Sequence, residues 1–191
     1  MKLLSGTFLL ALSKPLTAWQ SSDSLSPFHH AFPVHDLALA KQFYGEVLGL
    51  TEGRSSTKWQ DYSLDGHQIV AHWVGSDYRC PDFYNPVDGD EVPVPHYGLA
   101  MSVDNFHRFA SRLRAHNVAF VIEPHLRFQG QPGEQWTMFF KDPSGNNLEF
   151  KAMTKPSNLF AKYHVDDLEV PPSAEEAAVD ESDGAGSTCQ Q

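Results

Sequence analysis

Residues 36–49 read DLALAKQFYGEVLG and decide the fold of the first half of this chain. Asp36 is a good N-cap, because its side chain can accept hydrogen bonds from the free amides of a first helical turn. Gly49 is placed to end the helix in a left-handed conformation. Apolar residues recur between these ends at steps of three and four, and they form one helix face: Leu37, Ala40, Phe43, Tyr44, Val47 and Leu48. The stretch therefore predicts an amphipathic helix.

Strand patterns surround this helix. Residues 28–34 alternate in character and are rich in Phe and Val, as in a half-buried strand. Residues 59–64 and 68–74 read as two further strands around an Asp65-Gly66 hairpin turn. The first half follows the order βαβββ less clearly than the second half, because only two strands are evident after its helix.

The second half repeats this order. A strand is expected from about 96 to 103, and Asp104 or Asn105 is expected to cap the helix that follows. The apolar face of this helix is Phe106, Phe109, Ala110 and Leu113. Three strands are expected after it, at 118–122, 136–140 and 147–151, the last two on either side of a turn at 142–145.

One βαβββ half cannot bury both faces of its sheet. Two halves side by side can close a cupped mixed sheet, with helices outside and a cavity within. The sequence therefore predicts an α+β fold in which two βαβββ modules form one domain. Its expected boundaries are 26–155 for the domain, 28–75 for module one, 76–95 for a proline-containing linker, and 96–154 for module two. A leader at 1–25 and an acidic tail at 156–191 flank the domain.

The net charge of −10 is unevenly distributed. No Lys or Arg follows Lys162, but eight acids do, and removing their charges from −10 leaves −2 for the rest of the chain. A nearly balanced domain does not imply nucleic acid or an acidic membrane as a partner. The acidic end, which also contains Pro, Ala, Ser and Gly, predicts a disordered, solvating tail.

The N-terminus differs from the rest of the chain. Residues 1–12 have a basic start and a short apolar run, which is too short to span a bilayer and fits a secretory signal. The Ala18-Trp19 junction and the Ser-rich residues 21–24 resemble the bipartite plastid presequences of algae with secondary plastids. A secretory or plastid location is therefore expected if the leader is a signal, and a cytoplasmic one if it is not. Cys80 and Cys189 are expected to be free thiols.

Two segments resemble the vicinal oxygen chelate superfamily, which includes glyoxalase I, fosfomycin-resistance proteins and extradiol dioxygenases. They are the helix segment at 36–50 and the turn and strand DPSGNNLEF at 142–150. The resemblance covers about 28–153. Three shorter segments resemble a subgroup of predicted extradiol-type dioxygenases: GHQIVAH at 66–72, VPVPH at 92–96 and RFQGQPGEQ at 127–135.

The resemblance implies a metal site. In the superfamily, a ligand from the first strand of each half and a carboxylate from the last strand converge in the cupped sheet. The superfamily spacing selects His29 and Glu149. His30 must point the other way, because strand side chains alternate. His96 opens the corresponding strand of the second half, but its step to Asp104 is one residue longer than in the first half, which a bulge or a longer strand end would absorb.

Two imidazoles and one carboxylate form a facial ligand set that binds Fe(II) and leaves coordination positions open. A substrate with two adjacent oxygens can chelate such an ion, which then acts as a Lewis acid and a template. Fe(II) or Mn(II) would suit ring cleavage of a catechol, and Zn(II) or Ni(II) would suit an enediolate isomerisation. Glyoxalase I commonly adds a carboxylate from the first half, where this chain offers Val70 and His72.

The sequence therefore favours a non-haem Fe(II) dioxygenase of the extradiol type, acting on a small vicinal diol or catechol. A glyoxalase-like isomerase, an epimerase or a thiol transferase with Zn, Ni or Mn is the first alternative. A non-catalytic small-molecule binding protein of the resistance type is the second. Pairing of the two halves within one chain or across a homodimer is left open.

His72 could face the cavity as a general acid or base, or lie on the outer face of the sheet. A polar loop rich in Gly and Pro precedes a core strand, and it suits either a substrate-clamping lid or a solvated loop. Its candidate substrate contacts are Arg127, Gln131, Glu134 and Gln135.

Overall fold

The computed structural model describes residues 26–163. The leader expected at 1–25 and residues 164–191 of the tail expected at 156–191 lie outside the described residues. Between residues 26 and 163, no helix is long and apolar enough to cross a membrane.

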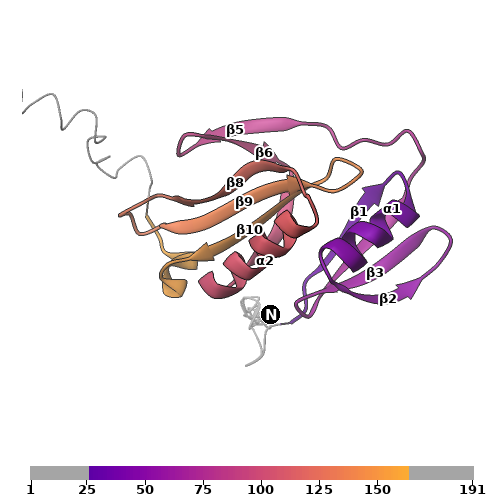
Figure 1. The fold of residues 1–191 in the computed structure, drawn as a ribbon, viewed down its shortest axis with the longest axis horizontal. Coiled ribbons are helices and arrows are strands. Elements are labelled where there is room, and N and C mark those ends of the chain that lie inside the picture. Colours follow the sequence, from indigo (N-terminus) through magenta and orange to yellow (C-terminus); the bar gives the residue numbers. More distant parts are fainter. Residues whose placement is uncertain (1–25, 164–191) are drawn as a thin grey trace, which may run out of the picture.

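The first module is a four-stranded sheet with one helical segment packed on it (Figure 1). Its elements are β1 (His29–Val34), α1 (Leu37–Lys41), η1 (Gln42–Val47), β2 (Thr51–Ser55), β3 (Trp59–Leu64) and β4 (His67–Trp73). The strand order is β1-β4-β3-β2, with β1 parallel to β4 and the other pairs antiparallel. Asp36 caps α1 as predicted, because its Oδ1 accepts hydrogen bonds from the amides of Ala38 and Leu39 at 2.7 and 3.0 Å.

The predicted helix is not α-helical throughout. From Gln42 onward it has π-helical turns, and the amide of Leu48 donates to the carbonyl of Phe43, five residues back, at 2.9 Å. Gly49 then takes a φ of +78°, in the left-handed region that glycine tolerates, and ends the segment as predicted. Apolar periodicity alone does not distinguish an α-helix from a π-helix. The sequence therefore predicted the segment and its ends but not its π-helical turns.

The second module repeats the order of the first. Its elements are β7 (His96–Ala100), α2 (Val103–Ala115), β8 (Phe120–Arg127), β9 (Gln135–Lys141) and β10 (Asn147–Met153), followed by the short helix η2 (Pro156–Phe160). The strand order is β7-β10-β9-β8, with β7 parallel to β10. The expected cap was wrong: Ser102 caps α2, and its Oγ accepts from the amide of Asn105 at 3.3 Å. The strand ends earlier than predicted, at Ala100, so the helix begins earlier too.

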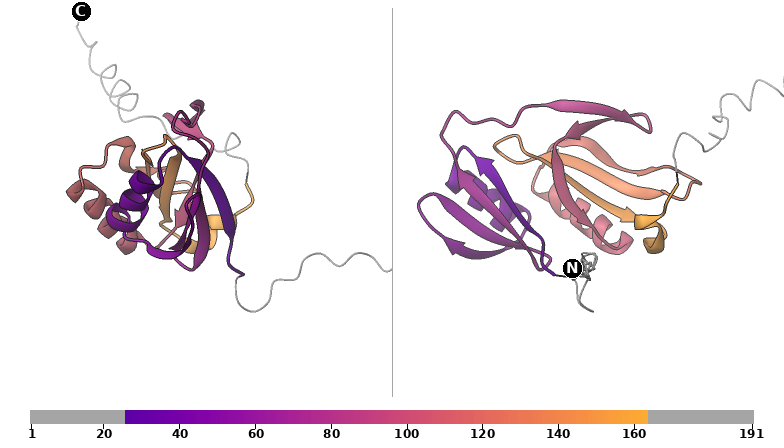
Figure 2. Two further views of the ribbon diagram at one scale, coloured as in Figure 1. Left: turned by 90° about the vertical axis from the view of Figure 1, so that its right-hand side faces the viewer. Right: turned by 180° about the vertical axis from the view of Figure 1, so that it is seen from behind.

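A β-hairpin occupies the segment expected to be a linker. Its strands are β5 (Phe83–Val87) and β6 (Asp90–Val94), which pair with each other alone among the described strands. Asp88 and Gly89 join them with φ values of +51° and +81°, the signs that a type I′ turn requires. In Figures 1 and 2 the hairpin extends from the end of the first module along the second.

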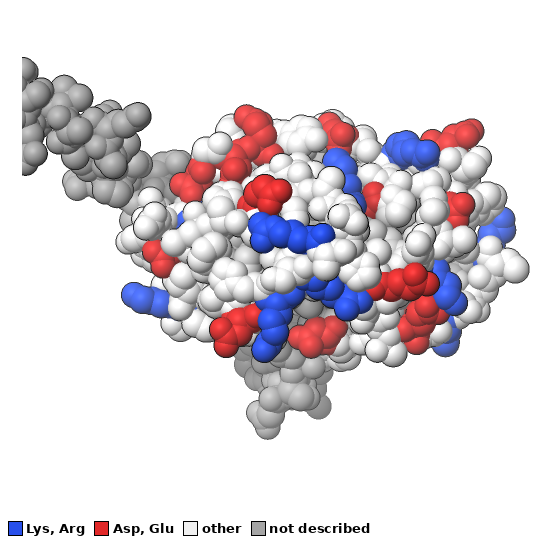
Figure 3. Space-filling view, viewed as in Figure 1, with Lys and Arg blue, Asp and Glu red and all other residues white. Residues whose placement is uncertain are grey.

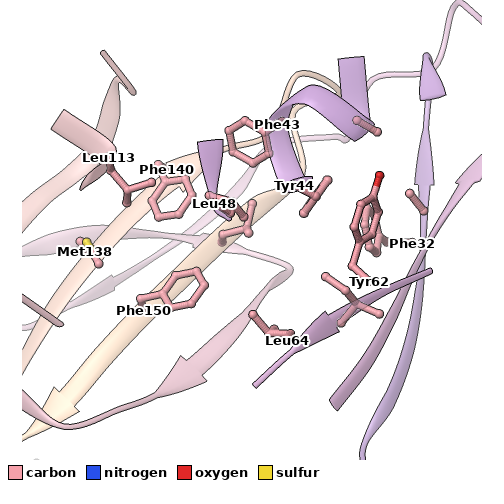
Figure 4. Packing of buried hydrophobic residues seen from close by; sticks show 14 of the residues in the cluster. Phe32, Phe43, Tyr44, Leu48, Tyr62, Leu64, Leu113, Met138, Phe140 and Phe150 are labelled. Carbon is pink, nitrogen blue, oxygen red and sulfur yellow. The ribbon is translucent and has the colours of Figure 1, made fainter. Parts of the chain in front are cut away.

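The two modules share one hydrophobic core, formed by the helix-covered faces of both sheets (Figure 4). Phe43 and Tyr44, adjacent in η1, are both buried, and their rings pack against different sheets. The ring of Phe43 lies 6.3 Å from that of Phe140 in β9, whereas the ring of Tyr44 lies 5.1 Å from that of Phe32 in β1. The helical segment therefore joins the two sheets.

A buried polar network crosses the same boundary. The hydroxyl of Tyr44 donates to Asp142 Oδ2 at 2.8 Å and lies 2.7 Å from the hydroxyl of Tyr97 in β7. The second carboxylate oxygen, Oδ1, accepts from the amides of Ser144 and Asn146. Burial raises the pKa of Asp142, while these hydrogen bonds oppose the rise. Burial also raises the pKa of Tyr44, so the phenol stays protonated as a donor.

We expect Tyr44→Phe to destabilise the protein by about 1–3 kcal/mol, because it leaves the buried carboxylate of Asp142 without one of its donors. Urea unfolding followed by circular dichroism measures the change. Tyr84→Phe is the matched control, because Tyr84 lies on the hairpin and is 43% exposed. Equal stability of the two variants would contradict a role for the network in joining the modules.

Candidate metal centre

The candidate ligands lie on the sheet faces that point away from the shared core. In β1, His30 and Phe32 approach Tyr97 at 4.6 and 5.2 Å between ring centroids, so the alternating residue His29 faces the other side. In the second module, Phe150 packs in the core, so Glu149 faces the other side as well.

His96 and Glu149 form a pair on the second module. The Nε2 atom of His96 lies 3.3 Å from Oε2 of Glu149, although the two residues come from β7 and β10. The parallel pairing places Asn147 beside His96 and Glu149 beside Gly98. The one-residue irregularity of spacing therefore does not keep the two side chains apart.

Further hydrogen bonds fix the orientation of both ligands. The Nδ1 atom of His96 lies 2.7 Å from the carbonyl oxygen of Pro93, which can only accept, so Nδ1 carries a proton and Nε2 is the nitrogen that faces Glu149. Nε2 donates to the carboxylate when the ring is protonated, and it offers a lone pair to a cation when the ring is neutral. The Oε1 atom of Glu149 accepts from the hydroxyl of Thr137 at 2.9 Å. An imidazole oriented by a carbonyl and a carboxylate oriented by a hydroxyl are the usual support of metal ligands. The residues present therefore fit a divalent ion.

The interaction between His96 and Glu149 shifts the pKa values of both side chains. The hydrogen bond that protonated His96 donates to Glu149 raises the pKa of His96, although burial acts against the rise. Burial tends to raise the pKa of Glu149, but the hydrogen bond from His96 and the charge of Lys151, 3.8 Å away, leave it lowered.

His29 belongs to a different face. It is exposed at the start of β1, and its Nδ1 atom lies 2.7 Å from Oε1 of Gln68 in β4. Among residues 26–163, no three His, Cys, Asp or Glu side chains converge as a metal site. The chain by itself thus brings together His96 and Glu149 but not His29.

His72 lies on the same face of β4 as Gln68, as its strand parity predicts, and it is exposed. The register places it beside Pro33, at the far end of β1 from His29. The residue that touches His29 is instead Gln68. The sequence indicated that Gln68 and Val70 lie on the same face of the strand, because they are two residues apart. Only the strand register shows that Gln68 is the one that contacts His29.

The candidate loop residues make contacts within the fold. Arg127 is 4% exposed, and its Nε lies 3.2 Å from Oδ2 of Asp90 on the hairpin. Glu134 accepts a hydrogen bond from the amide of Gly130 at 2.8 Å. Gln135 is buried at the start of β9, and Gln131 keeps a buried Oε1 without a partner among the described residues.

The hairpin covers part of the face that carries His96. Val92 packs with Ile122 and Phe139 in a second, smaller apolar cluster. Phe139 also meets the imidazole of His96 edge to face at 5.2 Å. Beside His96, a cavity of about 270 Å³ opens between β1 and β7. The hairpin and Phe139 thus form an apolar wall next to the candidate ligands.

We expect Asp90→Asn to destabilise the protein by about 2–4 kcal/mol, because it leaves the buried guanidinium of Arg127 without its nearest carboxylate. Chemical unfolding measures the loss. Glu123→Gln is the control, since its pair with Arg114 is exposed on both sides and surface pairs contribute little. A loss no larger than that of the control would show that the hairpin is not held by this pair.

The pair of His96 and Glu149 predicts a pH-dependent stability in chelator-treated protein. The raised pKa of His96 gives stability that is complete below about pH 6.5 and is lost as pH rises through the folded value. The lowered pKa of Glu149 gives stability present above about pH 4.5 and lost as pH falls through the folded value. Glu149→Gln should therefore cost more stability near pH 6 than near pH 9. A pH-independent cost, measured by unfolding at both values, would contradict the ion pair.

Acidic and basic side chains are interspersed on the face of the molecule shown in Figure 3. This mixed surface agrees with the nearly balanced charge of the domain, and it does not present a basic stripe of the kind that binds nucleic acid.

Solved structures share this fold. A glyoxalase/bleomycin resistance protein/dioxygenase from Alicyclobacillus acidocaldarius matches with a TM-score of 0.61 and 26% identity, over 71% of this chain and 96% of that one. A lactoylglutathione lyase from Agrobacterium tumefaciens matches with a TM-score of 0.51 and 18% identity, over 74% and 100%. The fosfomycin resistance protein FosX from Listeria monocytogenes matches with a TM-score of 0.51 and 19% identity, over 73% and 100%. At such low identity, the last two show the fold alone.

No curated protein matches this chain. The family model of the Glyoxalase/Bleomycin resistance protein/Dioxygenase superfamily matches residues 27–150, which is most of the described part. This match and the order of the strands confirm the α+β class, the two βαβββ modules and the resemblance to vicinal oxygen chelate proteins. The chain belongs to the glyoxalase/bleomycin resistance protein/dioxygenase superfamily.

Proposed function

We propose that this protein is a divalent-metal-dependent enzyme, and specifically a non-haem Fe(II) dioxygenase of the extradiol type that acts on a small vicinal diol or catechol. The observation that carries the proposal is the pair of His96 and Glu149, held 3.3 Å apart with the Nε2 atom of the imidazole directed at the carboxylate. A solvated surface pair would not need the buried hydroxyl of Thr137 behind the carboxylate.

His29 would supply the third ligand. A divalent ion held by two imidazoles and one carboxylate keeps open positions, at which two adjacent substrate oxygens can be bound and polarised. The chain's own contribution is to hold the ligands and to keep water out on one side, where Phe139 and the hairpin residue Val92 pack together.

The third ligand implies a second copy of the chain. The helix-covered faces of the two sheets are buried against each other, so the faces with His29 and with His96 point away from the same core. Among the described strands, β1 pairs only with β4 and β7 only with β10, which leaves one edge of each strand free. Free edges can approach another chain. We infer a homodimer in which His29 of one protomer joins His96 and Glu149 of its partner.

Metal content tests the proposal first. Protein purified without oxygen should contain about one iron ion per chain and take up oxygen with a catechol. His29→Ala, His96→Ala and Glu149→Gln should each lose the ion. The exposed His116→Ala variant at the end of α2 is the control and should keep it. Ion retained by the His96→Ala variant would contradict the proposed ligand set, and no stoichiometric metal together with unchanged behaviour of that variant would eliminate both enzyme proposals.

The identity of the metal separates the alternatives. Zinc, nickel or manganese without oxygen uptake would favour an isomerase, an epimerase or a thiol transferase on the same ligands. Small-molecule binding without any stoichiometric metal would favour a resistance-type binding protein. In either enzyme, the His72→Phe variant tests the acid–base role proposed for His72. Unchanged turnover of this variant would exclude that role.

Complementation tests the shared site. Neither the His29→Ala nor the His96→Ala variant should be active alone, but their co-expression should restore about a quarter of wild-type activity. Half of randomly formed dimers are mixed, and each mixed dimer keeps one intact site of two. Co-expression of His96→Ala with Glu149→Gln is the control and should restore nothing, because both changes affect the same half of the site. Equal behaviour of the two mixtures would contradict a site shared between chains.

A further inference from the structure

A chain of three hydrogen bonds lies behind His29. Its Nδ1 atom is 2.7 Å from Oε1 of Gln68 in β4. The Nε2 atom of Gln68 donates to Oδ2 of Asp61 in β3 at 3.0 Å. The same Oδ2 accepts from Nε of Arg54 in β2, also at 3.0 Å. The chain therefore crosses all four strands of the first module.

The donor and acceptor groups of these side chains determine the direction of the hydrogen bonds. The carboxylate of Asp61 can only accept, so the side of the Gln68 amide that faces it must be the NH₂ group. The amide oxygen then faces His29, and an amide oxygen can only accept. A flipped amide would place its oxygen against the carboxylate of Asp61 and lose that bond. Nδ1 of His29 must therefore carry the proton, which leaves the lone pair on Nε2.

The carboxylate that sets this direction is itself unusual. Asp61 is 5% exposed, although it lies on the face of β3 away from the shared core. A buried carboxylate is costly unless it is paired and hydrogen-bonded. Its partners, Arg54 and Gln68, lie on the neighbouring strands. The core of the first module, built from residues of the opposite face, does not require an acid here.

The second module reaches the same result by a different route. There, the backbone carbonyl of Pro93 accepts from Nδ1 of His96, so Nε2 is the nitrogen that faces Glu149. In the first module a side-chain amide, held by a buried acid, takes the place of that carbonyl. Both histidines thus present the same ring nitrogen. The Pro93 carbonyl and the Gln68 amide are unrelated acceptors, yet each holds a proton on Nδ1 of its histidine. Such agreement is expected of metal ligands and not of incidental surface histidines.

We propose that Gln68 and Asp61 are positioning residues, which hold His29 in the Nδ1–H tautomer and present its Nε2 atom to a divalent cation. The tautomer follows from the hydrogen bonds alone. Only the presence of the cation rests on the function proposed above.

The tautomer can be measured without any metal. In chelator-treated protein with ¹⁵N-labelled histidine, at a pH about two units above the ordinary histidine pKa, nitrogen chemical shifts show which ring nitrogen of His29 carries the proton. The wild type should show it on Nδ1. Gln68→Leu removes the acceptor and should shift the ring toward the Nε2–H form. Gln42→Leu, a change on the exposed side of η1, is the control and should leave the tautomer unchanged.

A conservative change at Asp61 separates positioning from general structural support. Asp61→Asn keeps an oxygen that accepts from Gln68 and should preserve the Nδ1–H form. Asp61→Leu removes that oxygen and should lose it. Amide spectra identify any variant that has failed to fold. An Nε2–H ring in the wild type, or an unchanged tautomer in Gln68→Leu, would overturn the proposal.

Cation binding is a separate readout. Gln68→Leu should weaken binding of Mn(II), measured by titration, by about 10–100-fold, which is the usual effect of losing the support of a metal ligand. If the wild type shows the Nδ1–H form but binds no Mn(II), Zn(II) or Fe(II), the proposed function fails and the positioning of His29 stands. If the wild type binds a cation and Gln68→Leu changes neither the affinity nor the tautomer, the positioning fails and the proposed function stands.

Discussion

The contact between the helix-covered faces of the two sheets determines where every candidate ligand lies. A βαβββ module leaves one sheet face to be covered by its own short helical segment, and that segment is too small to bury it alone. In this chain, the rings of Phe43 and Tyr44 lie between the two sheets and contact both. The faces with His29 and with His96 are consequently directed away from the common core.

The polar network between the modules has a further consequence. The hydroxyl of Tyr44 and the turn around Asp142 hold β1 close to the start of β10, where the side-chain amide of Asn146 donates to the carbonyl of Pro33 at 2.9 Å. The same turn leads directly into the strand that carries Glu149. The packing of the modules and the placement of one ligand therefore depend on the same few residues.

The hairpin covers part of the face of the second module that carries His96. Burial of the Arg127 guanidinium and of the ring of Phe139 requires β5 and β6 to lie over β8 and β9. The sequence carried a signal for this hairpin, the Asp88-Gly89 turn between apolar residues, but the prolines around it favoured an irregular linker. Proline is tolerated here because the hairpin has only two strands, so its outer edges need no ladder partners.

Local patterns were sufficient for the elements and for the family. Helix periodicity and the cap at Asp36 predicted the first helical segment, and the turn DPSGN predicted the entry to β10, because these features depend on neighbours in sequence. The cap at Ser102 was missed, since several residues at 102–105 can cap a helix and only the end of β7 decides among them.

The sequence by itself predicted the α+β class and the two modules, because these depend on short-range patterns, and its resemblance to the superfamily implied the candidate ligands. The tertiary structure decided which ligands meet. Strand register, which spacing does not specify, placed Gln68 rather than Val70 or His72 against His29, and it brought His96 to Glu149 in spite of the irregular spacing. Packing between the modules separated His29 from that pair, because the direction of a sheet face is set by what the opposite face buries.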